Sequence, residues 1–540
     1  MPRYIFITGG VLSSLGKGVS AASTGFLLKE KGFRVSIMKL DPYLNVDAGT
    51  MNPFQHGEVF VTEDGGETDL DIGHYERFLG EYLTKKHNVT SGQVYRAVIE
   101  RERRGEYLGA TVQIIPHLTD EIKHRIREVA QEGHLDILIV EVGGTVGDIE
   151  SLPFLEAIRQ MRMEEGEENT FYIHVGMLVY LRNAGELKTK PMQHSIMKLR
   201  EIGIQPDALI LRSEVKPGPE EIDKVARASN LHPRRVFLSL DLPTVYELPL
   251  ELEKQGITDV ILDSLNLPPR SQHRHMDRWK EFVSRVKSSS ESVRVGIVGK
   301  YVHIRDAYKS IFEALIHSGA RHGVRVDAVL INSEEVEQEK VNLREINLDA
   351  ILIPGGFGKR GIEGKIQAIR FARENKIPFL GICLGMQLSV IEFARNVLGL
   401  EGASSTEFSP ETPHPVIDLM PEQKDVDAKG GTMRLGASPI DVEEGTLAFR
   451  LYTKNRIYER HRHRYEVNPR YIESLRKGGM VISGMDPGRK YVEIIELPDH
   501  PFFIASQFHP EFRSQPLSTS PLFDGFIEAA IQRKRAKGQG

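Results

Sequence analysis

The chain has 540 residues, of which 40% are hydrophobic and 27% are charged, with a formal net charge of −5 and a single cysteine. That length allows two or more domains, and the mildly acidic balance disfavours nonspecific binding to nucleic acid. No apolar run approaches the roughly 18 residues of a membrane span, no charged and apolar leader precedes the first strand, and one cysteine excludes an intramolecular disulfide. We therefore expect a cytoplasmic protein with no membrane segment.

The N-terminal segment combines a strand with a glycine-rich loop. The apolar run 4–8 predicts a buried strand, and the loop over 9–18 (GGVLSSLGKG) leads into a helical pattern over 19–31. In such loops the backbone N–H groups and the helix N-terminus face a phosphate, and Lys17 adds a positive charge. The standard motif ends in Gly-Lys-Ser/Thr, but Gly18 follows Lys17 here, so Ser20 or a distant carboxylate is left to hold magnesium. The alternative is a glycine-rich turn with a surface lysine.

Two acidic positions are candidate magnesium ligands, because this cation prefers oxygen ligands. One is the acidic run over 67–71 (ETDLD), for which a solvated turn is the alternative. The other is Glu141, which ends the apolar run 135–140 just before Gly143 and Gly144. A carboxylate on an apolar run is uncommon, and this position therefore indicates a function.

Predicted strands and helices alternate along the chain. We expect further strands at 34–39, 136–141, 171–180, 207–212 and 235–239, and helices at 117–131, 152–163 and 190–202. This alternation is typical of parallel sheets with helices on both faces. The pattern lapses over 267–292, which we interpret as a linker with one amphipathic helix over 275–287 that carries Trp279. The predicted fold class is α/β, with two doubly wound parallel-sheet domains over 1–266 and 293–540.

The second half begins with a strand over 293–298 and contains a glycine turn after a predicted strand over 349–353. The glycines at 355–358 (GGFG) can expose backbone N–H groups to a developing oxyanion, although most glycine clusters are simply tight turns. Residues 402–436 are polar and rich in turns, and we expect a mobile lid there. The basic tail over 533–537 is expected to be solvated and frayed.

Cys383 lies at a predicted strand-to-helix turn between Gly381 and Gly385. A thiol at a helix N-terminus meets partial positive charge and unpaired N–H groups, which stabilise a thiolate and an oxyanion. This layout is that of a nucleophile elbow with sulfur in place of the serine oxygen. The alternative is a buried structural cysteine.

A base for this thiol is available near the C-terminus. His509 follows the apolar run 502–506, and Glu511 lies two residues beyond it, after Pro510. A histidine with a carboxylate at this spacing can receive the thiol proton while the carboxylate orients the imidazole. Taken singly, His509 and Glu511 are each equally typical of an ordinary surface loop. Together with Cys383 they predict a catalytic triad.

These motifs, in this order, resemble the class I glutamine amidotransferase family over residues 293–530. The resemblance implies that Cys383, His509 and Glu511 hydrolyse the side-chain amide of glutamine to glutamate and ammonia. It also places Gly356 and Leu384 at the oxyanion hole.

Further stretches resemble the CTP synthase family over essentially the whole chain: 9–18, 39–43, 55–59, 109–113, 143–150, 188–191 and 459–467. The resemblance implies a P-loop NTPase-like synthase domain followed by the amidotransferase domain. It implies conversion of UTP to CTP with ATP, Mg2+ and glutamine, and internal passage of ammonia. It further implies a homotetramer that GTP activates and the product CTP inhibits.

The resemblance also assigns residues to sites, by groups. The ATP site is assigned Ser14, Leu15, Gly16, Lys17, Gly18, Val19, Lys39, Asp71 and Leu242. The UTP/CTP site is assigned Ser13, Asp148, Ile149, Glu150, Lys188, Thr189, Lys190, Pro191, Met192, Gln193 and Lys224. The glutamine pocket is assigned Gly356, Leu384, Gly385, Met386, Gln387, Glu407 and Arg464. Magnesium is assigned to Asp71 and Glu141, and the ammonia exit to His56.

Several alternatives stay open. The lysines of the nucleotide group are equally typical of a solvated basic face, and Arg464 of an exposed arginine. Another phosphate-loop amidoligase, such as a cobyrinic acid amidase, would also join an ATP domain to an amidotransferase domain. A nucleotide-switch or filament-forming scaffold with a decayed amidotransferase domain is a different class, which the complete Cys-His-Glu set disfavours.

Overall fold

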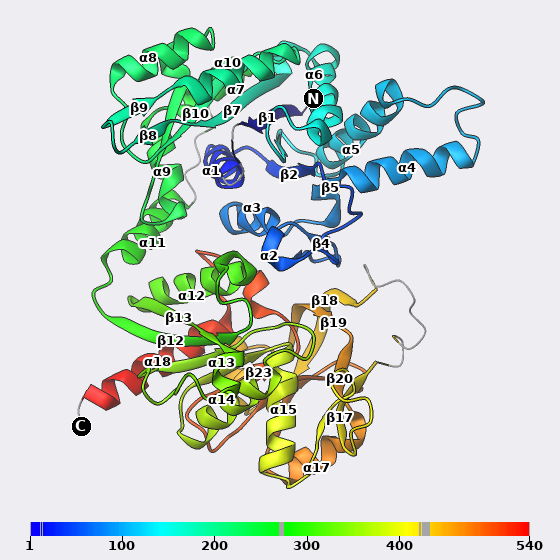
Figure 1. Ribbon diagram of the computed structural model, residues 1–540, viewed down its shortest axis with the longest axis vertical. Coiled ribbons are helices and arrows are strands. Elements are labelled where there is room, and N and C mark those ends of the chain that lie inside the picture. The colour runs from blue at the N-terminus through cyan, green and yellow to red at the C-terminus, as the bar shows by residue number, and fades with distance from the viewer. Residues whose placement is uncertain are drawn as a thin grey trace. The chain divides into compact units, whose positions relative to one another are not determined.

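The structure is a computed structural model that describes residues 2–10, 12, 15–268, 270, 275–420, 423 and 432–538. Ser13 and Ser14 therefore lie outside the described residues. The chain divides into two compact units, one of Met1–Ala48 with Asp71–Val283 and one of Gly49–Leu70 with Ser284–Gly540 (Figure 1). The domain boundaries expected from the sequence stay a prediction, and by its contacts the segment Gly49–Leu70 groups with the second unit.

The first unit contains a seven-stranded sheet in the order β11-β10-β7-β1-β6-β2-β5, in which every pair is parallel. Its strands are β1 (Arg3–Gly9), β2 (Val35–Asp41), β5 (Asn88–Thr90), β6 (Ile137–Val142), β7 (Thr170–Met177), β10 (Ala208–Ser213) and β11 (Val236–Leu240). Strands covered on both faces need continuous apolar runs, which is why the sequence predicted most of them. The short strand β5, at the sheet edge, was not predicted.

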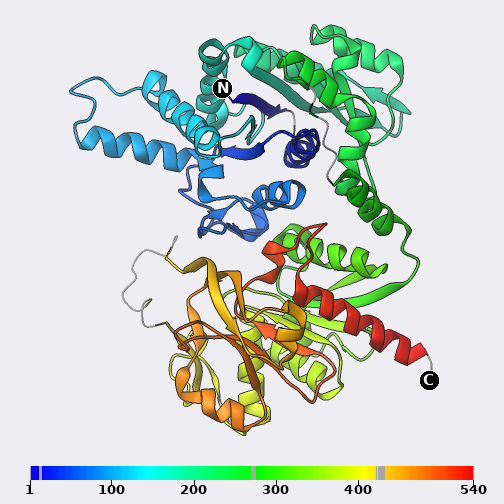
Figure 2. The ribbon, with the colours of Figure 1, turned by 180° about the vertical axis from the view of Figure 1, so that it is seen from behind.

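Helices cover both faces of this sheet. The helices α4 (Ser91–Arg103), α5 (Thr119–Glu132) and α6 (Leu152–Glu165) share one core with Tyr4 and Phe6 of β1. The helix α1 (Lys17–Glu30) packs on the other face, where a Cβ at Gly25 would lie 2.8 Å from Ile37 Cδ1. The C-terminal end of α4 and the loop after it project away from the rest of this unit in both views (Figures 1 and 2).

The helix α11 (Met276–Ser288) confirms the helix predicted at 275–287, and its first turns pack into the first unit. The Trp279 ring lies with its centroid 4.2 Å from that of Phe26 and 5.3 Å from that of Phe78. The indole N–H donates to the Tyr246 carbonyl at 2.8 Å. Glu30 accepts from the N–H of Met276 at 2.8 Å, which satisfies the start of the helix.

Trp279→Ala is expected to destabilise the first unit by about 3–5 kcal/mol. The substitution removes a fully buried ring and leaves the Tyr246 carbonyl without its hydrogen-bond donor. Denaturant unfolding followed by far-UV circular dichroism measures the change. Lys280→Ala, an exposed neighbour on the same helix, is the control. Equal unfolding midpoints for the two variants would contradict the packing described.

The second unit contains a nine-stranded sheet in the order β13-β12-β14-β15-β23-β22-β21-β18-β19. The first five strands are parallel: β13 (Arg325–Asn332), β12 (Ser292–Gly299), β14 (Ala350–Ile353), β15 (Phe379–Ile382) and β23 (Phe503–Ser506). The other four extend the sheet in antiparallel fashion: β22 (Val492–Glu496), β21 (Val481–Met485), β18 (Arg434–Val442) and β19 (Arg456–His463). The α/β fold class is confirmed, and the antiparallel extension is a feature that the sequence pattern did not predict.

Helices also cover both faces of the second sheet. The helices α13 (Ser333–Glu337), α14 (Ile362–Glu374) and α15 (Leu384–Asn396) share one core. The helices α12 (Lys309–His322) and α18 (Pro521–Gly538) lie side by side over the other face (Figures 1 and 2). The expected frayed tail is wrong, because α18 continues to Gly538 and Lys537 Nζ lies 2.8 Å from the Leu348 carbonyl and 3.1 Å from Asp349.

The region predicted to be a lid is only partly described. It contributes β16 (Ser404–Ser405) and β17 (Pro415–Leu419), which form a small sheet with β20 (Tyr465–Val467). Residues 421–422 and 424–431 lie outside the described residues, so the lid stays a prediction. Within the described part of the chain, no helix is both long and apolar enough to cross a membrane.

Ion pairs hold the segment Gly49–Leu70 in the second unit. The segment forms α2 (Pro53–His56), β3 (Phe60–Val61) and β4 (Glu67–Thr68). Arg460 and Arg462 of β19 pair with Glu63 at 2.7 Å and with Glu67 at 2.8 Å. The side chain of Arg460 is fully buried, so the partner carboxylate is needed to compensate its charge.

Candidate active sites

Cys383 lies between β15 and α15 and has φ 53° and ψ −103°, a strained conformation for a residue other than glycine. Its N–H donates to the Ser506 carbonyl at 2.7 Å, which fixes the turn against β23. A Cβ at Gly385 would lie 2.3 Å from the Ile353 carbonyl oxygen, and one at Gly381 would lie 2.9 Å from the Gly385 carbonyl carbon. The two flanking glycines are therefore required for the sharp turn that presents the thiol at the start of α15.

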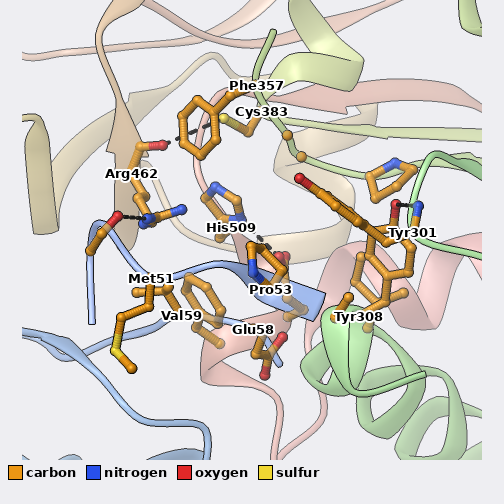
Figure 3. A pocket seen from close by; sticks show the side chains of 18 of the residues that line it. Met51, Pro53, Glu58, Val59, Tyr301, Tyr308, Phe357, Cys383, Arg462 and His509 are labelled. Carbon is orange, nitrogen blue, oxygen red and sulfur yellow. Dashed lines mark hydrogen bonds and ion pairs between the residues drawn. The ribbon is translucent and has the colours of Figure 1, made fainter. Parts of the chain in front are cut away.

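The structure brings His509 and Glu511 to the cavity that this thiol lines, and Figure 3 shows Cys383 and His509 there. His509 Nδ1 and Glu511 Oε1 lie 2.7 Å apart, and the backbone N–H of His509 donates to the Arg460 carbonyl at 2.8 Å. A Cβ at Gly355 would lie 2.9 Å from His509 Cε1 and 3.6 Å from Cys383 Cβ, so imidazole and thiol flank the same glycine. His509 Nε2 has no hydrogen-bond partner within the described chain and is available to the sulfur.

The surroundings of His509 favour its charged form. Burial opposes the positive charge, but Glu511 and Cys383 outweigh burial and raise the pKa of His509 to about 10. An imidazolium at neutral pH is the partner that a thiolate nucleophile needs.

Glu511→Gln is expected to lower kcat for glutamine hydrolysis roughly 10²- to 10⁴-fold, because the amide no longer supports the charged imidazole or its orientation. Steady-state release of glutamate measures the change. Gln keeps the size of the side chain, so the melting temperature is expected to stay close to that of the parent. A variant with parental kcat would show that Glu511 does not act on His509.

One cavity of about 380 Å³ opens on the thiol, and it gathers most of the residues assigned to glutamine. Glu407 Oε1 accepts from the Gly358 N–H at 2.9 Å, and the Arg464 guanidinium donates to Gln423 Oε1 at 2.6 Å. The side chains of Leu384 and Met386 are buried in the core of this unit, so only their backbone can face a ligand. The lining residues are Gly356, Phe357, Cys383, Gln387, Glu407, Gln423, His463, Arg464 and Tyr465.

A second cavity, of about 190 Å³, reaches Cys383 from another side (Figure 3). Met51, Pro53 and Val59 of the segment Gly49–Leu70 form part of its wall, together with Tyr301 and Tyr308. The thiol can thus be reached from two cavities within one unit. His56 ends the short helix α2 that begins at Pro53, but it does not line this cavity.

In the first unit, Lys17 folds back over the glycine-rich loop. Its ammonium donates to the Gly144 carbonyl, and a Cβ at Gly9 would lie 2.5 Å from Lys17 Cδ. Burial lowers the pKa of Lys17, and Lys39 adds to this effect, while Glu141 and Asp71 oppose it. Gly9 is therefore needed for the lysine to reach this position, near Lys39 and the carboxylates of Glu141 and Asp71.

The departure from the standard motif has a structural cause. A Cβ at Gly18 would lie only 2.2 Å from Asp71 Oδ1, so a serine or threonine cannot occupy this position without displacing the carboxylate. Asp71 begins α3 (Asp71–Leu79) and pairs with Lys39 Nζ at 2.6 Å. The carboxylate thus lies where the motif elsewhere supplies a hydroxyl.

Glu141 faces the same region from β6, where it pairs in register with Lys39 of β2. Its side chain accepts a hydrogen bond from the Tyr75 hydroxyl, and burial, with the charge of Asp71, raises its pKa to about 7. The described residues contain no cluster of three or more His, Cys, Asp or Glu side chains suited to a metal. Two carboxylates suffice for magnesium when phosphate oxygens and water complete its coordination.

The residues assigned to UTP fall on three elements. Asp148 accepts from the Thr145 N–H at 2.6 Å, Thr189 precedes α7 (Lys190–Glu201), and Lys224 lies exposed on α8 (Pro219–Ala228). No hydrogen bond or ion pair joins the three groups within the described chain. Met192 is a core residue, since a Cβ at Gly176 would lie 1.9 Å from its sulfur, so its side chain cannot contact a nucleotide.

Lys365 was not predicted as a functional residue from the sequence. This lysine lies on α14 and is only 1% exposed. The signal was present, because Lys365 shares the apolar helical spacing of Ile362, Ile366 and Ile369. A lysine on such a face is seldom buried without a reason.

Comparison with known proteins accounts for both units. The family model described as CTP synthase N-terminus matches residues 3–267, and that of class-I glutamine amidotransferase matches residues 303–529. A CTP synthase of Caldanaerobacter subterraneus is 57% identical over 99% of this chain and 99% of its own length. One of Methanocaldococcus jannaschii is 57% identical over 98% and 99%, and one of Thermococcus gammatolerans is 56% identical over 99% of both. The chain belongs to the CTP synthase family.

Proposed function

We propose that this chain converts UTP to CTP, with ATP to activate the pyrimidine and glutamine to supply the nitrogen. The observation that carries the proposal is the presence of two complementary sites in one chain. One unit brings Cys383, His509 and Glu511 together, and the other brings Lys17, Asp71 and Glu141 together. Ammonia made at the first site is useful only where a second site consumes it.

The arrangement of groups around the Cys383 thiol supports the following steps for glutamine hydrolysis. Cys383 Sγ attacks the side-chain amide carbon, and the N–H groups near Gly356 and Leu384 receive the oxyanion. His509 gives a proton to the leaving nitrogen, so ammonia departs and a thioester remains. Water then hydrolyses the thioester to glutamate and regenerates the thiol. Glu407 suits the substrate ammonium, and Arg464 suits its carboxylate, since both line the same cavity.

The cavity behind the thiol supports an exit route for ammonia. Its wall includes Met51 and Pro53, and the latter begins the short helix that ends at His56. We assign His56 to the far end of this route. The nitrogen then reacts at C4 of UTP, after ATP has phosphorylated the O4 oxygen, and it displaces phosphate.

The ATP site consists of the loop that ends at Gly18, the two lysines Lys17 and Lys39, and Leu242 at the adenine. Magnesium, held by Asp71 and Glu141, would neutralise the phosphate charge during transfer. The fit is supported by the pairing of Asp71 with Lys39 and by the space that Gly18 leaves for the carboxylate.

The UTP site is proposed at the start of α7 with Lys188 and Lys190, at Asp148–Glu150 and at Lys224. Positive side chains suit a triphosphate, and the N-terminus of α7 adds backbone donors. The same site would take the product CTP as an inhibitor, and GTP is proposed as the activator of glutamine hydrolysis.

We also propose a homotetramer that acts in the cytoplasm. Exposed apolar side chains support association of the subunits. Leu108, on the loop after α4, is 94% exposed, and Ile149, among the residues assigned to UTP, is 80% exposed. Ile114 and Ile115 are also exposed. The single cysteine, which excludes an intramolecular disulfide, supports the location.

Incubation of the chain with UTP, ATP, magnesium and glutamine, and again with an ammonium salt in place of glutamine, tests the function. CTP, ADP and phosphate are expected in both, and glutamate only in the first. Glutamate release without CTP in either mixture would contradict the proposed acceptor.

A further inference from the structure

Lys365 is a buried cation without a partner beside the glutaminase site. No hydrogen bond or ion pair to its ammonium exists within the described chain, although its side chain is almost completely buried. Removing a charge from water is costly unless an opposite charge compensates it. A fold that keeps such a lysine therefore leaves a place for an anion nearby.

The ammonium lies next to the loop that follows β14. A Cβ at Gly356 would lie 3.8 Å from Lys365 Nζ and 3.6 Å from Leu384 Cδ2. Gly356 and Leu384 carry the backbone N–H groups that are proposed to bind the oxyanion. The positive charge thus lies close to the two residues whose N–H groups are proposed for the oxyanion.

The charges around Lys365 divide into those that act on it and those already paired. Burial and Lys300 lower its pKa, Cys383 and Glu407 raise it, and the result is about 7. On the neighbouring elements Glu334 pairs with Arg360 at 3.2 Å, and Glu363 pairs with Arg395 at 2.8 Å. The charged forms of Cys383 and Glu407 are therefore the anions that remain to balance the lysine.

We propose that the Lys365 ammonium stabilises the anions of the glutaminase site, the Cys383 thiolate and the oxyanion of the tetrahedral intermediate. Lys365 is a positioning residue that acts through its charge and does not touch the reacting atoms. The oxyanion part rests on the proposed function, whereas the thiolate part concerns the free protein and does not.

The proposal predicts a pH-dependent effect on the thiol. Lys365 is charged below its pKa of about 7 and loses its charge as the pH rises through that value. Its support for the thiolate is therefore greatest below pH 7, falls as the pH rises through about 7 and disappears in alkali. Because Cys383 is the only cysteine, alkylation of the whole chain by iodoacetamide reports on this one thiol.

The test compares the parent chain with Lys365→Met, which keeps the length of the side chain and removes its charge. The rate of alkylation is measured without substrates between about pH 5.5 and 9.5, a range that spans the lysine titration. At pH 6 the parent is expected to react about tenfold faster than Lys365→Met. Loss of the nearby positive charge is expected to lower the thiolate fraction of Cys383 about tenfold, which corresponds to one pH unit. The two rates should converge above about pH 9.

Two further variants separate charge from packing. Lys365→Arg keeps a positive charge over the whole pH range, so it is expected to match the parental rate at pH 6 and to keep its support for the thiolate above pH 7. Lys359→Met removes an exposed charge from the loop before α14 and is expected to change nothing. In turnover, Lys365→Met should lower kcat for glutamine hydrolysis about tenfold with little change in KM, while CTP formation from ammonium stays at the parental rate.

Superimposable alkylation profiles of the parent and Lys365→Met would overturn the proposal. An equal loss in Lys365→Arg and Lys365→Met would also overturn it, because it would show that packing and not charge matters. A parent that does not hydrolyse glutamine would refute the proposed function, and the alkylation profiles would still decide the role of Lys365.

Discussion

Cys383→Ala is expected to lower glutamine-dependent CTP formation by more than about 10⁴-fold while leaving the ammonium-dependent reaction close to parental. The substitution removes the sulfur that forms the thioester, and no second cysteine can replace it. The ammonium reaction should persist because Lys17, Asp71 and Glu141 belong to the other unit. Steady-state CTP formation with each nitrogen source measures both.

The control for this prediction is the melting temperature, since alanine at Cys383 keeps the strained φ and removes only a small buried side chain. Retained use of glutamine would show that Cys383 is not the nucleophile. Loss of both reactions in a variant with a parental melting temperature would show that the two sites are not independent.

Gly18→Ser is expected to abolish CTP formation with either nitrogen source, although it restores the residue that the standard phosphate-loop motif prefers. The new Cβ would lie 2.2 Å from Asp71 Oδ1, so the carboxylate must leave its pairing with Lys39 or the loop must shift. Basal glutamine hydrolysis in the second unit should remain. Steady-state CTP and glutamate formation separate the two effects.

Gly538→Ser is the matched control, because a Cβ at Gly538 meets no atom within 4 Å. It should leave both reactions unchanged. If Gly18→Ser instead increased CTP formation, a serine hydroxyl would serve in this loop and the structural reason given for Gly18 would be wrong.

The sequence predicted most of the first sheet because its strands are buried on both faces and read as continuous apolar runs. It did not predict the antiparallel part of the second sheet. The strand β19 carries Arg460 and Arg462, whose charges mask its strand character and are compensated by Glu63 and Glu67 from a distant part of the chain. Pairing over that separation leaves no local pattern to find.

The triad residues were recognised because each stands in a distinctive local motif, and the structure brings the three together. The resemblance also assigned Met192 to the nucleotide site, but its side chain is part of the core. Lys365, unlike the triad residues, does not stand in a distinctive local motif. A single lysine in an amphipathic helix was therefore not recognised from the sequence. Only its burial beside Gly356 sets it apart.

The measurement that tests the central claim most directly follows the nitrogen atom. The chain is supplied with UTP, ATP, magnesium and glutamine labelled with ¹⁵N in the side-chain amide, and the CTP is analysed by mass spectrometry. The label is expected in the exocyclic amine of CTP, with one glutamate formed for each CTP. Unlabelled CTP, or glutamate with no CTP at all, would contradict the coupling of the two sites.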